Sequence, residues 1–350
     1  MTTLTAQPPA PLLDRLTQLA RPRETELFLA RPLSALLAMH SVELLRARRE
    51  HFGRRVLLFA PLYVANACMN DCSYCGFRRS SRVRRQRLGP GAVLREAELL
   101  AERGHRSLDL VAGEVPRDVF IDSVARVVDA ILRRTAIERI HLNLGVLTDA
   151  QFRRLRDAGA VGYHLYQETY DRETYAKVHR AGPKSAMEPR LEAIARAHAA
   201  GFERIGLGVL LGLAPLTDEL ALLAAHAEWL AEQAPGVRLG FSLPRIQRVD
   251  EACDFQAPVG VDDEAFLKAL LFLRLKFPRA ELTVTTRERA DLRDRTLAFG
   301  VTKLSAGVST APGGYGHSDD ATPQFSIHDE RSLAEVAEAV RASGLEPVVS

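Results

Sequence analysis

Residues 68–77 read Cys68-Met69-Asn70-Asp71-Cys72-Ser73-Tyr74-Cys75-Gly76-Phe77, and this run holds three of the four cysteines of the 350-residue chain. The fourth, Cys253, is distant in sequence. The N-terminus has no continuous apolar segment of the kind that directs secretion, so we do not expect a disulfide framework. Three closely spaced thiols instead indicate a site for a soft metal.

Two kinds of metal site compete for these thiols. A structural zinc ion needs a closed set of four ligands, and no further Cys or His lies near residues 68–77 to complete it. A four-iron cluster held by three thiolates leaves one iron open, and that iron is able to bind and activate a substrate. The run therefore predicts an iron–sulfur site, with three cysteines that bind no metal as the alternative.

Composition and charge argue against several classes of protein. The chain is 47% hydrophobic and carries a formal net charge of +3. This composition is ample for a large core, and so weak a field gives no case for a nucleic-acid or membrane protein. The longest uncharged apolar run, 205–217, is too short to span a bilayer. We therefore expect a cytoplasmic protein that binds neither nucleic acid nor membrane.

Apolar patterning predicts a (β/α)8 barrel. Helical patterns over 12–19 and 27–49 predict an N-terminal helical extension over 1–50. Farther along, apolar runs typical of parallel strands buried on both faces alternate with helical patterns. The predicted strands are 56–66, 107–112, 138–144, 161–167, 204–211, 237–243, 281–285 and 301–305. The clearest helical patterns among and after them are 93–103, 120–134, 149–158, 187–200, 219–233, 262–277 and 332–342. We expect the barrel over 51–350, with a lid segment over 308–330.

Polar and glycine residues gather where the predicted strands end. In barrels of this kind the active site lies at the carboxyl ends of the strands. The groups that follow the eight strands in turn are the cysteine loop, Gly113-Glu114, Asn143 with Gly145, Gln167-Glu168, Gly208 with Gly212, Arg245, Thr286-Arg287-Glu288, and Ser305 with Gly307. We therefore predict a single active site at that end of the barrel.

The cysteine spacing resembles that of a known superfamily. CxxxCxxC with an aromatic residue before the last cysteine, here Tyr74, is similar to the signature of radical S-adenosylmethionine (SAM) enzymes. Residues 61–67 before the motif and Gly76-Phe77-Arg78 after it look like the 2-iminoacetate synthases, the tyrosine lyases of thiamin biosynthesis. The hydrogenase-maturation tyrosine lyase is a close relative of that family. The resemblance covers residues 50–345.

This resemblance implies a [4Fe-4S] cluster and SAM as cofactors. Cys68, Cys72 and Cys75 would ligate the cluster, and SAM would bind the open iron through its amino and carboxylate groups. Glu114 would bind the SAM ammonium, and Arg190 the SAM carboxylate through two parallel hydrogen bonds. The residues expected to bind the cofactors are Tyr74, Gly76, Phe77, Gly113, Glu114, Asn143, Glu168, Arg190 and Gly208. The alternatives are loop packing for the aromatic residues, barrel packing for the glycines and an exposed helix position for the arginine.

The resemblance places the substrate deeper, against the last three strands. In the family an arginine after the sixth strand holds the amino-acid carboxylate, and the corresponding run here, 244–249, reads Pro-Arg-Ile-Gln-Arg-Val. Gln247 stands where the family has its second arginine, so Arg245 would act alone or Arg248 would reach in. The residues expected on the substrate side are Arg245, Arg248, Thr286, Arg287, Glu288 and Ser305.

The implied reaction is cleavage of the Cα–Cβ bond of L-tyrosine. One electron from the reduced cluster would break the C5′–S bond of SAM, and the resulting 5′-deoxyadenosyl radical would take a hydrogen from the tyrosine amino group. The products would be 2-iminoacetate (dehydroglycine) and, after reduction of the hydroxybenzyl fragment, 4-methylphenol. The departure at Gln247 leaves open an enzyme of the same branch that acts on another aromatic amino acid or in another cofactor pathway. A noncatalytic iron–sulfur module is a second alternative, although such a module would not need Glu114, Glu168 and Arg190.

Protein partners also follow from the resemblance. A reduced flavodoxin or ferredoxin-type protein would supply the electron, and thiazole synthase is a possible partner. Six arginines lie from Arg78 to Arg87. A charge run of this kind is usually a solvated loop, and cluster screening or donor docking are the functional alternatives. No cysteine follows Cys253, whereas the hydrogenase-maturation relative has a second cysteine set, so we do not expect formation of carbon monoxide and cyanide.

Overall fold

The structure is a computed structural model and describes residues 10–247, 255–316 and 322–350. Three helices precede the barrel: α1 (Leu12–Leu19), α2 (Pro22–Leu29) and α3 (Leu33–His51). The sequence predicted one helix over 27–49, which is wrong, because Pro32 stands directly before α3. Proline is tolerated at the start of a helix but not in its interior, so the chain bends there.

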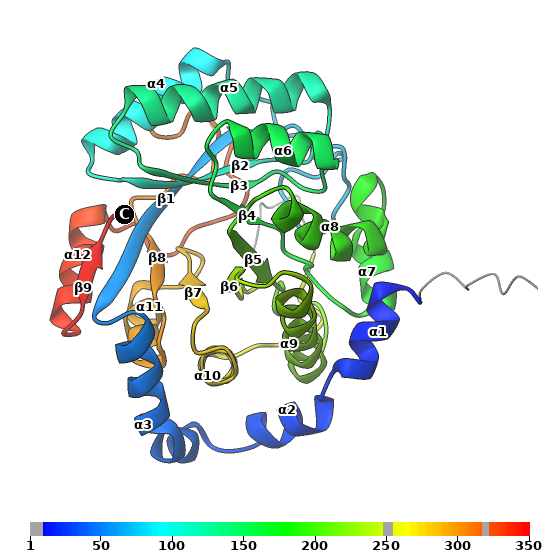
Figure 1. Ribbon diagram of the computed structural model, residues 1–350, viewed down its shortest axis with the longest axis vertical. Helices are drawn as coiled ribbons and strands as arrows, with labels where there is room; N and C mark the ends of the chain where they lie inside the picture. Colours follow the sequence, from blue (N-terminus) through cyan, green and yellow to red (C-terminus); the bar gives the residue numbers. More distant parts are fainter. Residues whose placement is uncertain (1–9, 248–254, 317–321) are drawn as a thin grey trace, which may run out of the picture.

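Eight parallel strands close into a barrel, which confirms the predicted (β/α)8 fold (Figure 1). The strands are β1 (Arg55–Ala65), β2 (Ser107–Ala112), β3 (Arg139–Asn143), β4 (Gly162–His164), β5 (Arg204–Gly208), β6 (Arg238–Ser242), β7 (Glu281–Val284) and β8 (Lys303–Ser305). Each strand pairs in parallel with the next, and β1 closes the ring by pairing with both β2 and β8.

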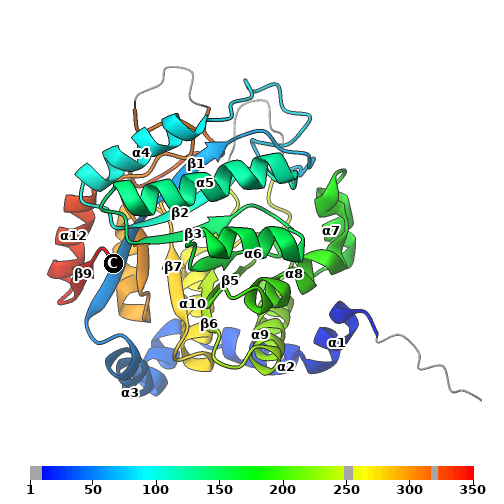
Figure 2. The same ribbon diagram turned by 45° about the horizontal axis from the view of Figure 1, so that its top comes forward.

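Helices surround this barrel. They are α4 (Pro90–Glu102), α5 (Asp118–Arg134), α6 (Asp149–Asp157), α7 (Arg172–Val178), α8 (Met187–Ala199), α9 (Leu216–Gln233), α10 (Asp263–Lys276), α11 (Ala290–Thr296) and α12 (Leu333–Ala342). The N-terminal helices pack on three of them: α1 on α8 and α9, α2 on α9 and α10, and α3 on α10. Figure 2 shows α1 to α3 at the end of the barrel where β1 begins, so the opposite end stays free for an active site.

The outer helices form because their apolar residues recur at helical spacing. In α5 the buried side chains include Phe120, Val124 and Ile131, which lie on one face of the helix. α6 begins with a capping box in which Thr148 and Gln151 exchange side-chain-to-backbone hydrogen bonds. The apolar faces of the helices and of the strands together make one hydrophobic core around the barrel.

Three short elements were not predicted from the sequence: β9 (Glu346–Val348), α7 and α11. The ninth strand, β9, pairs with the start of β1 on the edge opposite β8. Leu57 of β1 thus has Lys303 of β8 as its partner on one side and Val348 of β9 on the other. The helices α7 and α11 have seven residues each, too few for a clear apolar period.

The predicted strands 161–167 and 204–211 were too long. Regular pairing ends at His164 and Gly208, but the Gln167 N–H still donates to the Gly208 carbonyl oxygen at 2.9 Å, and Glu168 forms an isolated parallel bridge with Val209. Irregular pairing thus continues beyond the two regular strands, and residues there such as Leu210 are buried, which extends the apolar pattern.

Within the described residues, no single helix combines the length and the apolar character needed to cross a membrane; α2 and α3 meet those criteria only as a pair bent by 110°.

Candidate active site

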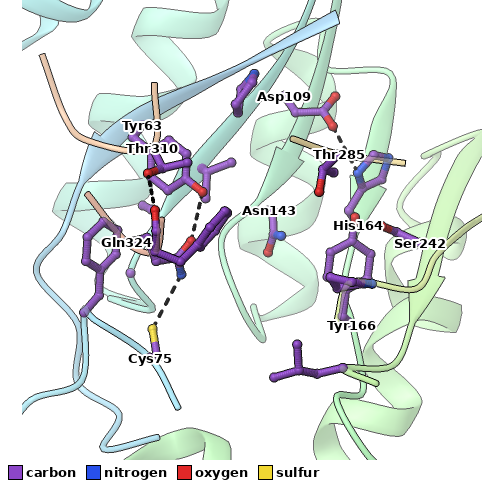
Figure 3. A pocket seen from close by; sticks show the side chains of 18 of the residues that line it. Tyr63, Cys75, Asp109, Asn143, His164, Tyr166, Ser242, Thr285, Thr310 and Gln324 are labelled. Carbon is purple, nitrogen blue, oxygen red and sulfur yellow. Dashed lines mark hydrogen bonds and ion pairs between the residues drawn. The ribbon is translucent and has the colours of Figure 1, made fainter. Parts of the chain in front are cut away.

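The carboxyl ends of the strands open into one cavity. The predicted site residues that line it are Cys68, Cys72, Tyr74, Cys75, Phe77, Gly113, Glu114, Asn143, Glu168, Arg190, Thr286, Arg287 and Ser305. Figure 3 shows Cys75 at one end of the cavity and Asp109 with His164 at the other, with Asn143 and Tyr166 between them. We call the first end the mouth and the second the floor.

The loop that carries the cysteines is held in place by hydrogen bonds from its own side chains. The Arg85 guanidinium donates to five carbonyl oxygens of this loop, those of Asn66, Phe77, Arg78, Arg79 and Ser81. Asn70 connects the loop to two others, since its Nδ2 donates to Glu114 Oε2 at 2.7 Å and its Oδ1 accepts from the Lys184 backbone N–H at 2.8 Å. Arg85 is exposed, but its hydrogen bonds make it part of the framework of the loop.

The three thiols fit an iron–sulfur cluster better than a single metal ion. Cys68, Cys72 and Cys75 are free and lie on one wall of the cavity. Burial raises the pKa of Cys72 to about 12 and also raises that of Cys68. No three Cys, His, Asp or Glu side chains of the described residues converge on one ion. In a four-iron cluster each thiolate binds its own iron atom, so the ligands lie farther apart.

Four buried charges form a mouth cluster beside the cysteines: Glu114, Glu168, Lys184 and Arg190. Lys184 Nζ donates to Glu168 Oε1 at 2.6 Å. The two Nη atoms of Arg190 lie 3.7 Å from Glu114 Oε2 and 3.9 Å from Glu168 Oε1. Arg190 Nη1 is buried without a hydrogen-bond partner among the described residues, and an unsatisfied buried donor costs roughly 1–3 kcal/mol. The cluster therefore has a spare hydrogen-bond donor, which suits an incoming carboxylate.

Backbone conformation shapes the mouth cluster. Glu168 has a φ of 73°, a left-handed conformation that costs a non-glycine residue roughly 1–3 kcal/mol. The next residue anchors this turn, because the Thr169 hydroxyl donates to the buried carboxylate of Glu219 on α9. Across the mouth, Gly145 has a φ of 88°, and a side chain there would lie 2.3 Å from Glu114 Cγ. The positions of both glutamates thus depend on the local backbone.

A second group of enclosed polar side chains lies at the floor: Asp109, His141, His164 and Lys303, which we call the floor cluster. Asp109 is its one carboxylate, and it faces His141 Nδ1 at 3.1 Å, His164 Nδ1 at 3.4 Å and Lys303 Nζ at 3.1 Å. Burial opposes its charge, but Lys303 and the histidines hold the pKa of Asp109 well below its usual range. Of these residues, Asp109 and His164 line the cavity.

Two residues predicted on the substrate side, Arg245 and Glu288, do not line the cavity. Arg245 does not line the cavity, because its Nε donates to both Glu288 carboxylate oxygens at 3.1 and 3.0 Å and its Nη1 donates to Asp263 at 3.1 Å. Glu288 is likewise turned away from the cavity to pair with this guanidinium. Neither residue is placed to hold a substrate carboxylate. Gln247 donates to the Arg287 carbonyl oxygen at 2.9 Å and so supports the neighbouring cavity residue.

Other predicted residues lie outside the cavity. Gly76 is buried within the cysteine loop, and Gly208 lies where β5 passes close to β6, since a side chain there would meet the Ser242 carbonyl oxygen at 2.2 Å. Gly208 therefore has the packing role that was the alternative to nucleoside binding. Arg248 and Cys253 lie outside the described residues.

Sequence reasoning did not assign four residues that the structure places at the site. Asn70 lies within the cysteine motif, between Cys68 and Cys72, so a search of that motif for polar residues would have found it. Lys184 lies in the Gly-Pro-Lys-Ser run over 182–185, to which sequence reasoning assigned no role. Asp109 and His164 are single polar residues within or at the end of apolar strands, and their inward orientation was the available signal.

Comparisons with known proteins define the class. Residues 62–225 match the model of the radical SAM superfamily, and residues 242–346 match that of the Biotin and Thiamin Synthesis associated domain. The barrel, with three cysteines at its mouth, is thus that of a radical SAM enzyme, which uses a [4Fe-4S] cluster and SAM, as predicted.

Individual relatives narrow this class. The chain is 35% identical over 305 residues to the 2-iminoacetate synthase of Escherichia coli (strain K12). The matched residues cover 87% of this chain and 80% of that protein. The FeFe-hydrogenase maturase HydG from Carboxydothermus hydrogenoformans has a TM-score of 0.86 and 33% identity, over 97% of this chain and 78% of HydG. Methylornithine synthase, with a TM-score of 0.75 and 20% identity over 96% of this chain and 97% of that chain, shares the fold. The chain belongs to the 2-iminoacetate synthase family.

Proposed function

We propose that the enzyme cleaves the Cα–Cβ bond of L-tyrosine to give 2-iminoacetate and 4-methylphenol, for formation of the thiamin thiazole. The observation that carries this proposal is a single cavity that combines three free thiols with a separate, unpaired cation, Arg287. The similarity to a 2-iminoacetate synthase over most of the chain supports the choice of reaction.

Arg287 is the residue that would hold the substrate carboxylate. Its guanidinium lies 3.4 Å from the centre of the Phe325 ring, and it forms no ion pair with a described acidic residue. Burial lowers its pKa, with partial compensation from surrounding groups. A guanidinium so placed binds a carboxylate favourably, because the pair forms parallel charge-assisted hydrogen bonds in a site shielded from water. Arg287 thus takes the part that the family resemblance assigns to Arg245.

The chain positions both cofactors and the substrate. Cys68, Cys72 and Cys75 would hold the cluster, and Arg190 would hold the SAM carboxylate at the mouth. When bound, the cluster and SAM supply a carbon-centred radical that removes a hydrogen atom from the substrate. Arg287 fixes the amino-acid end of the substrate, and a fixed distance of roughly 3–3.5 Å between the reacting atoms is what such a transfer demands.

We propose that residues of the predicted lid segment restrict access of water to the cavity. Thr310, Gln324 and Phe325, from the segment predicted to be a lid, line the same cavity as the thiols. Gln324 accepts from the Tyr63 hydroxyl at 2.9 Å, so this segment is joined to β1. A closed, dry site protects a reactive intermediate from side reactions, which supports the proposed role of the segment as a cover.

We also propose that a flavodoxin- or ferredoxin-type protein delivers the electron at the cysteine loop. Arg79 and Arg82 are exposed on this loop, and basic side chains beside a redox centre favour the approach of an acidic donor. Thiazole synthase would receive the product as a further partner.

Anaerobic reconstitution followed by mass spectrometry tests the proposed reaction. We expect tyrosine to stimulate SAM cleavage and to yield 4-methylphenol. Gln247, where the family has an arginine, favours a second candidate, a lyase for another aromatic amino acid. Stimulation by tryptophan alone, without 4-methylphenol from tyrosine, would establish that candidate instead.

Two arginine variants identify the carboxylate anchor. Arg287→Met should lower kcat/KM for tyrosine about 100-fold or more, because the substrate carboxylate loses its charge-assisted bonds. Arg245→Met should lower thermal stability, because it leaves the Glu288 carboxylate buried and unpaired, but it should leave KM for tyrosine unchanged. The reverse pattern would restore Arg245 as the anchor.

A further inference from the structure

The inner wall of this barrel carries charges where such barrels are usually filled with branched aliphatic side chains. The four side chains of the floor cluster come from four different strands and meet inside the barrel. They are almost fully enclosed, with exposed side-chain fractions of 9% for Asp109, 2% for His141, 12% for His164 and 1% for Lys303. Burial of charges costs several kcal/mol per ion unless partners compensate it. Such a group is weak evidence for stability and therefore a candidate for function.

The neighbouring strands leave room for the two imidazole rings. A Cβ atom on Gly162 would lie 2.1 Å from His141 Cδ2, and a Cβ atom on Gly206 would lie 2.5 Å from His164 Cδ2. Any side chain at either glycine would displace a ring from its place beside Asp109. The floor cluster is therefore built by residues of five strands, with glycines where the rings need space.

The contacts to Asp109 determine which ring nitrogens carry protons. A carboxylate only accepts hydrogen bonds, and Nδ1 of both His141 and His164 faces it. In the neutral ring a proton on Nδ1 leaves Nε2 as an acceptor. Burial lowers the pKa of His141 to about 4, so its Nε2 is an acceptor. In the same tautomer, with Nδ1–H directed at Asp109, His164 presents Nε2 as an acceptor on the side away from Asp109.

The two acceptors differ in their surroundings. His141 Nε2 is buried with no partner among the described residues, and His141 does not line the cavity. His164 lines the cavity, and no described group forms a hydrogen bond to its Nε2. Of the hydroxyls that line the cavity, that of Tyr63 donates to Gln324 Oε1 at 2.9 Å.

We infer that His164 is a specificity-determining residue that accepts a hydrogen bond from the ring hydroxyl of a para-hydroxylated aromatic amino acid. This inference rests on the proposed lyase function. With the amino-acid end held by Arg287, the ring extends toward the floor, and Figure 3 shows His164 at the end of the cavity remote from Cys75. A site built to bind a substrate hydroxyl rejects the analogue that lacks it, because its own polar group would be left buried and unpaired.

Substrate selectivity in matched histidine variants tests this role. The readout is the ratio of kcat/KM for tyrosine to that for phenylalanine, measured with reconstituted enzyme and coupled to formation of 5′-deoxyadenosine and the aromatic product. We expect His164→Leu to lower kcat/KM for tyrosine about 100-fold and to leave that for phenylalanine within about twofold. His164→Gln, which keeps a polar atom near the position of Nε2, should recover part of the ratio. His141→Leu removes the equivalent contact to Asp109 outside the cavity and should keep the wild-type ratio.

The outcomes separate this inference from the proposed function. A folded His164→Leu enzyme with the wild-type ratio overturns the role of His164, while tyrosine cleavage stands. If His164→Leu does not fold, the wild-type enzyme is tested with 4-aminophenylalanine. This analogue keeps a hydrogen-bond donor at the para position, so its kcat/KM should be at least about ten times that of phenylalanine. Equal rates for phenylalanine and tyrosine would also overturn the inference. A wild-type enzyme that gives no product from tyrosine overturns both.

Discussion

The mouth and the floor of the cavity each contain a buried ionic cluster, but the two clusters are built differently. The mouth cluster balances two carboxylates with two cations and still leaves Arg190 Nη1 without a partner. The floor cluster has one carboxylate, Asp109, against three nitrogen-bearing side chains. The mouth therefore has a spare hydrogen-bond donor, whereas the floor has spare acceptors on its imidazole rings.

This difference indicates what each end is able to bind. A buried guanidinium N–H is complementary to a carboxylate, and such a group belongs to the amino-acid part of SAM. A neutral imidazole nitrogen is complementary to a hydroxyl, which on our proposal belongs to the substrate. The elements differ as well: the mouth cluster lies on loops, on a short 3-10 helix (Pro183–Ser185) and on α8, and the floor cluster lies on strands. If the two ends act separately, a substitution at one end should leave the properties of the other end unchanged.

Cys72→Ser should have the largest effect and should act at the mouth alone. Loss of one thiolate ligand should abolish stable cluster binding and SAM cleavage. Iron and sulfide analysis after anaerobic reconstitution measures the cluster, and circular dichroism measures the fold, which should be unchanged. Met69→Ala is the matched control, because Met69 lies in the same loop with an exposed side chain. Wild-type iron content in Cys72→Ser would refute the ligand assignment.

Asp109→Asn should strongly destabilise the floor and leave the mouth intact. The substitution leaves Lys303 buried without its carboxylate, and the break of a buried ion pair costs roughly 3–5 kcal/mol. Denaturant unfolding measures this loss, and Asp122→Asn, which breaks an exposed pair with Arg154, should cost less than about 1 kcal/mol. SAM affinity of folded Asp109→Asn should match wild type. An affinity lowered as much as by an Arg190 variant would show that the two clusters are coupled.

Arg190→Met should weaken SAM binding about 100-fold, equivalent to about 2.7 kcal/mol. The variant removes the donor for the SAM carboxylate and leaves Glu114 and Glu168 without their shared cation. Equilibrium binding of SAM to the reconstituted enzyme measures the change. Arg196→Met is the control, because Arg196 lies on the same helix but bonds to Asp149 and the Leu147 carbonyl oxygen. Equal affinities for the two variants would remove Arg190 from the SAM site.

The sequence was sufficient to predict most of the residues at the mouth. Cys68, Cys72, Cys75 and Glu114 lie in contiguous motifs directly after strands, and the parallel barrel brings all such positions to one end. Alternating apolar and helical patterns were likewise enough for the barrel itself. Pattern length was a poorer guide to strand ends, because loop residues such as Leu210 are also buried.

The floor and the orientation of Arg245 could not be predicted in the same way. Asp109 and Lys303 are 194 positions apart, and only closure of the barrel brings them within hydrogen-bond distance. Arg245 follows its strand as expected, yet its side chain turns outward because Glu288 and Asp263 are within its reach. The direction of a long side chain depends on partners from other elements, which a linear motif does not specify.

Gln324→Leu should have the smallest effect, a change in the reduction potential of the cluster. Gln324 Nε2 lies 3.5 Å from Cys75 Sγ, and the Tyr63 hydroxyl, which donates to Gln324 Oε1, fixes the orientation of the amide. Hydrogen bonds to ligand sulfurs help to set the potentials of iron–sulfur clusters. Reduction adds negative charge to the sulfurs, so an N–H donor stabilises the reduced state more than the oxidised state.

The hydrogen bond from Gln324 stabilises the reduced cluster more than the oxidised cluster, and this difference determines the sign and size of the change in reduction potential. Loss of a hydrogen bond that favours the reduced state by about 1 kcal/mol lowers a one-electron potential by on the order of 40 mV. Redox titration of the cluster followed by electron paramagnetic resonance measures it in the absence of substrate. Tyr63→Phe, which only releases the amide, should shift the potential in the same direction by less. Because His164 lies at the other end of the cavity, His164→Leu should not shift the potential; a shift equal to that of Gln324→Leu would mean that the floor is not electrostatically separate from the mouth.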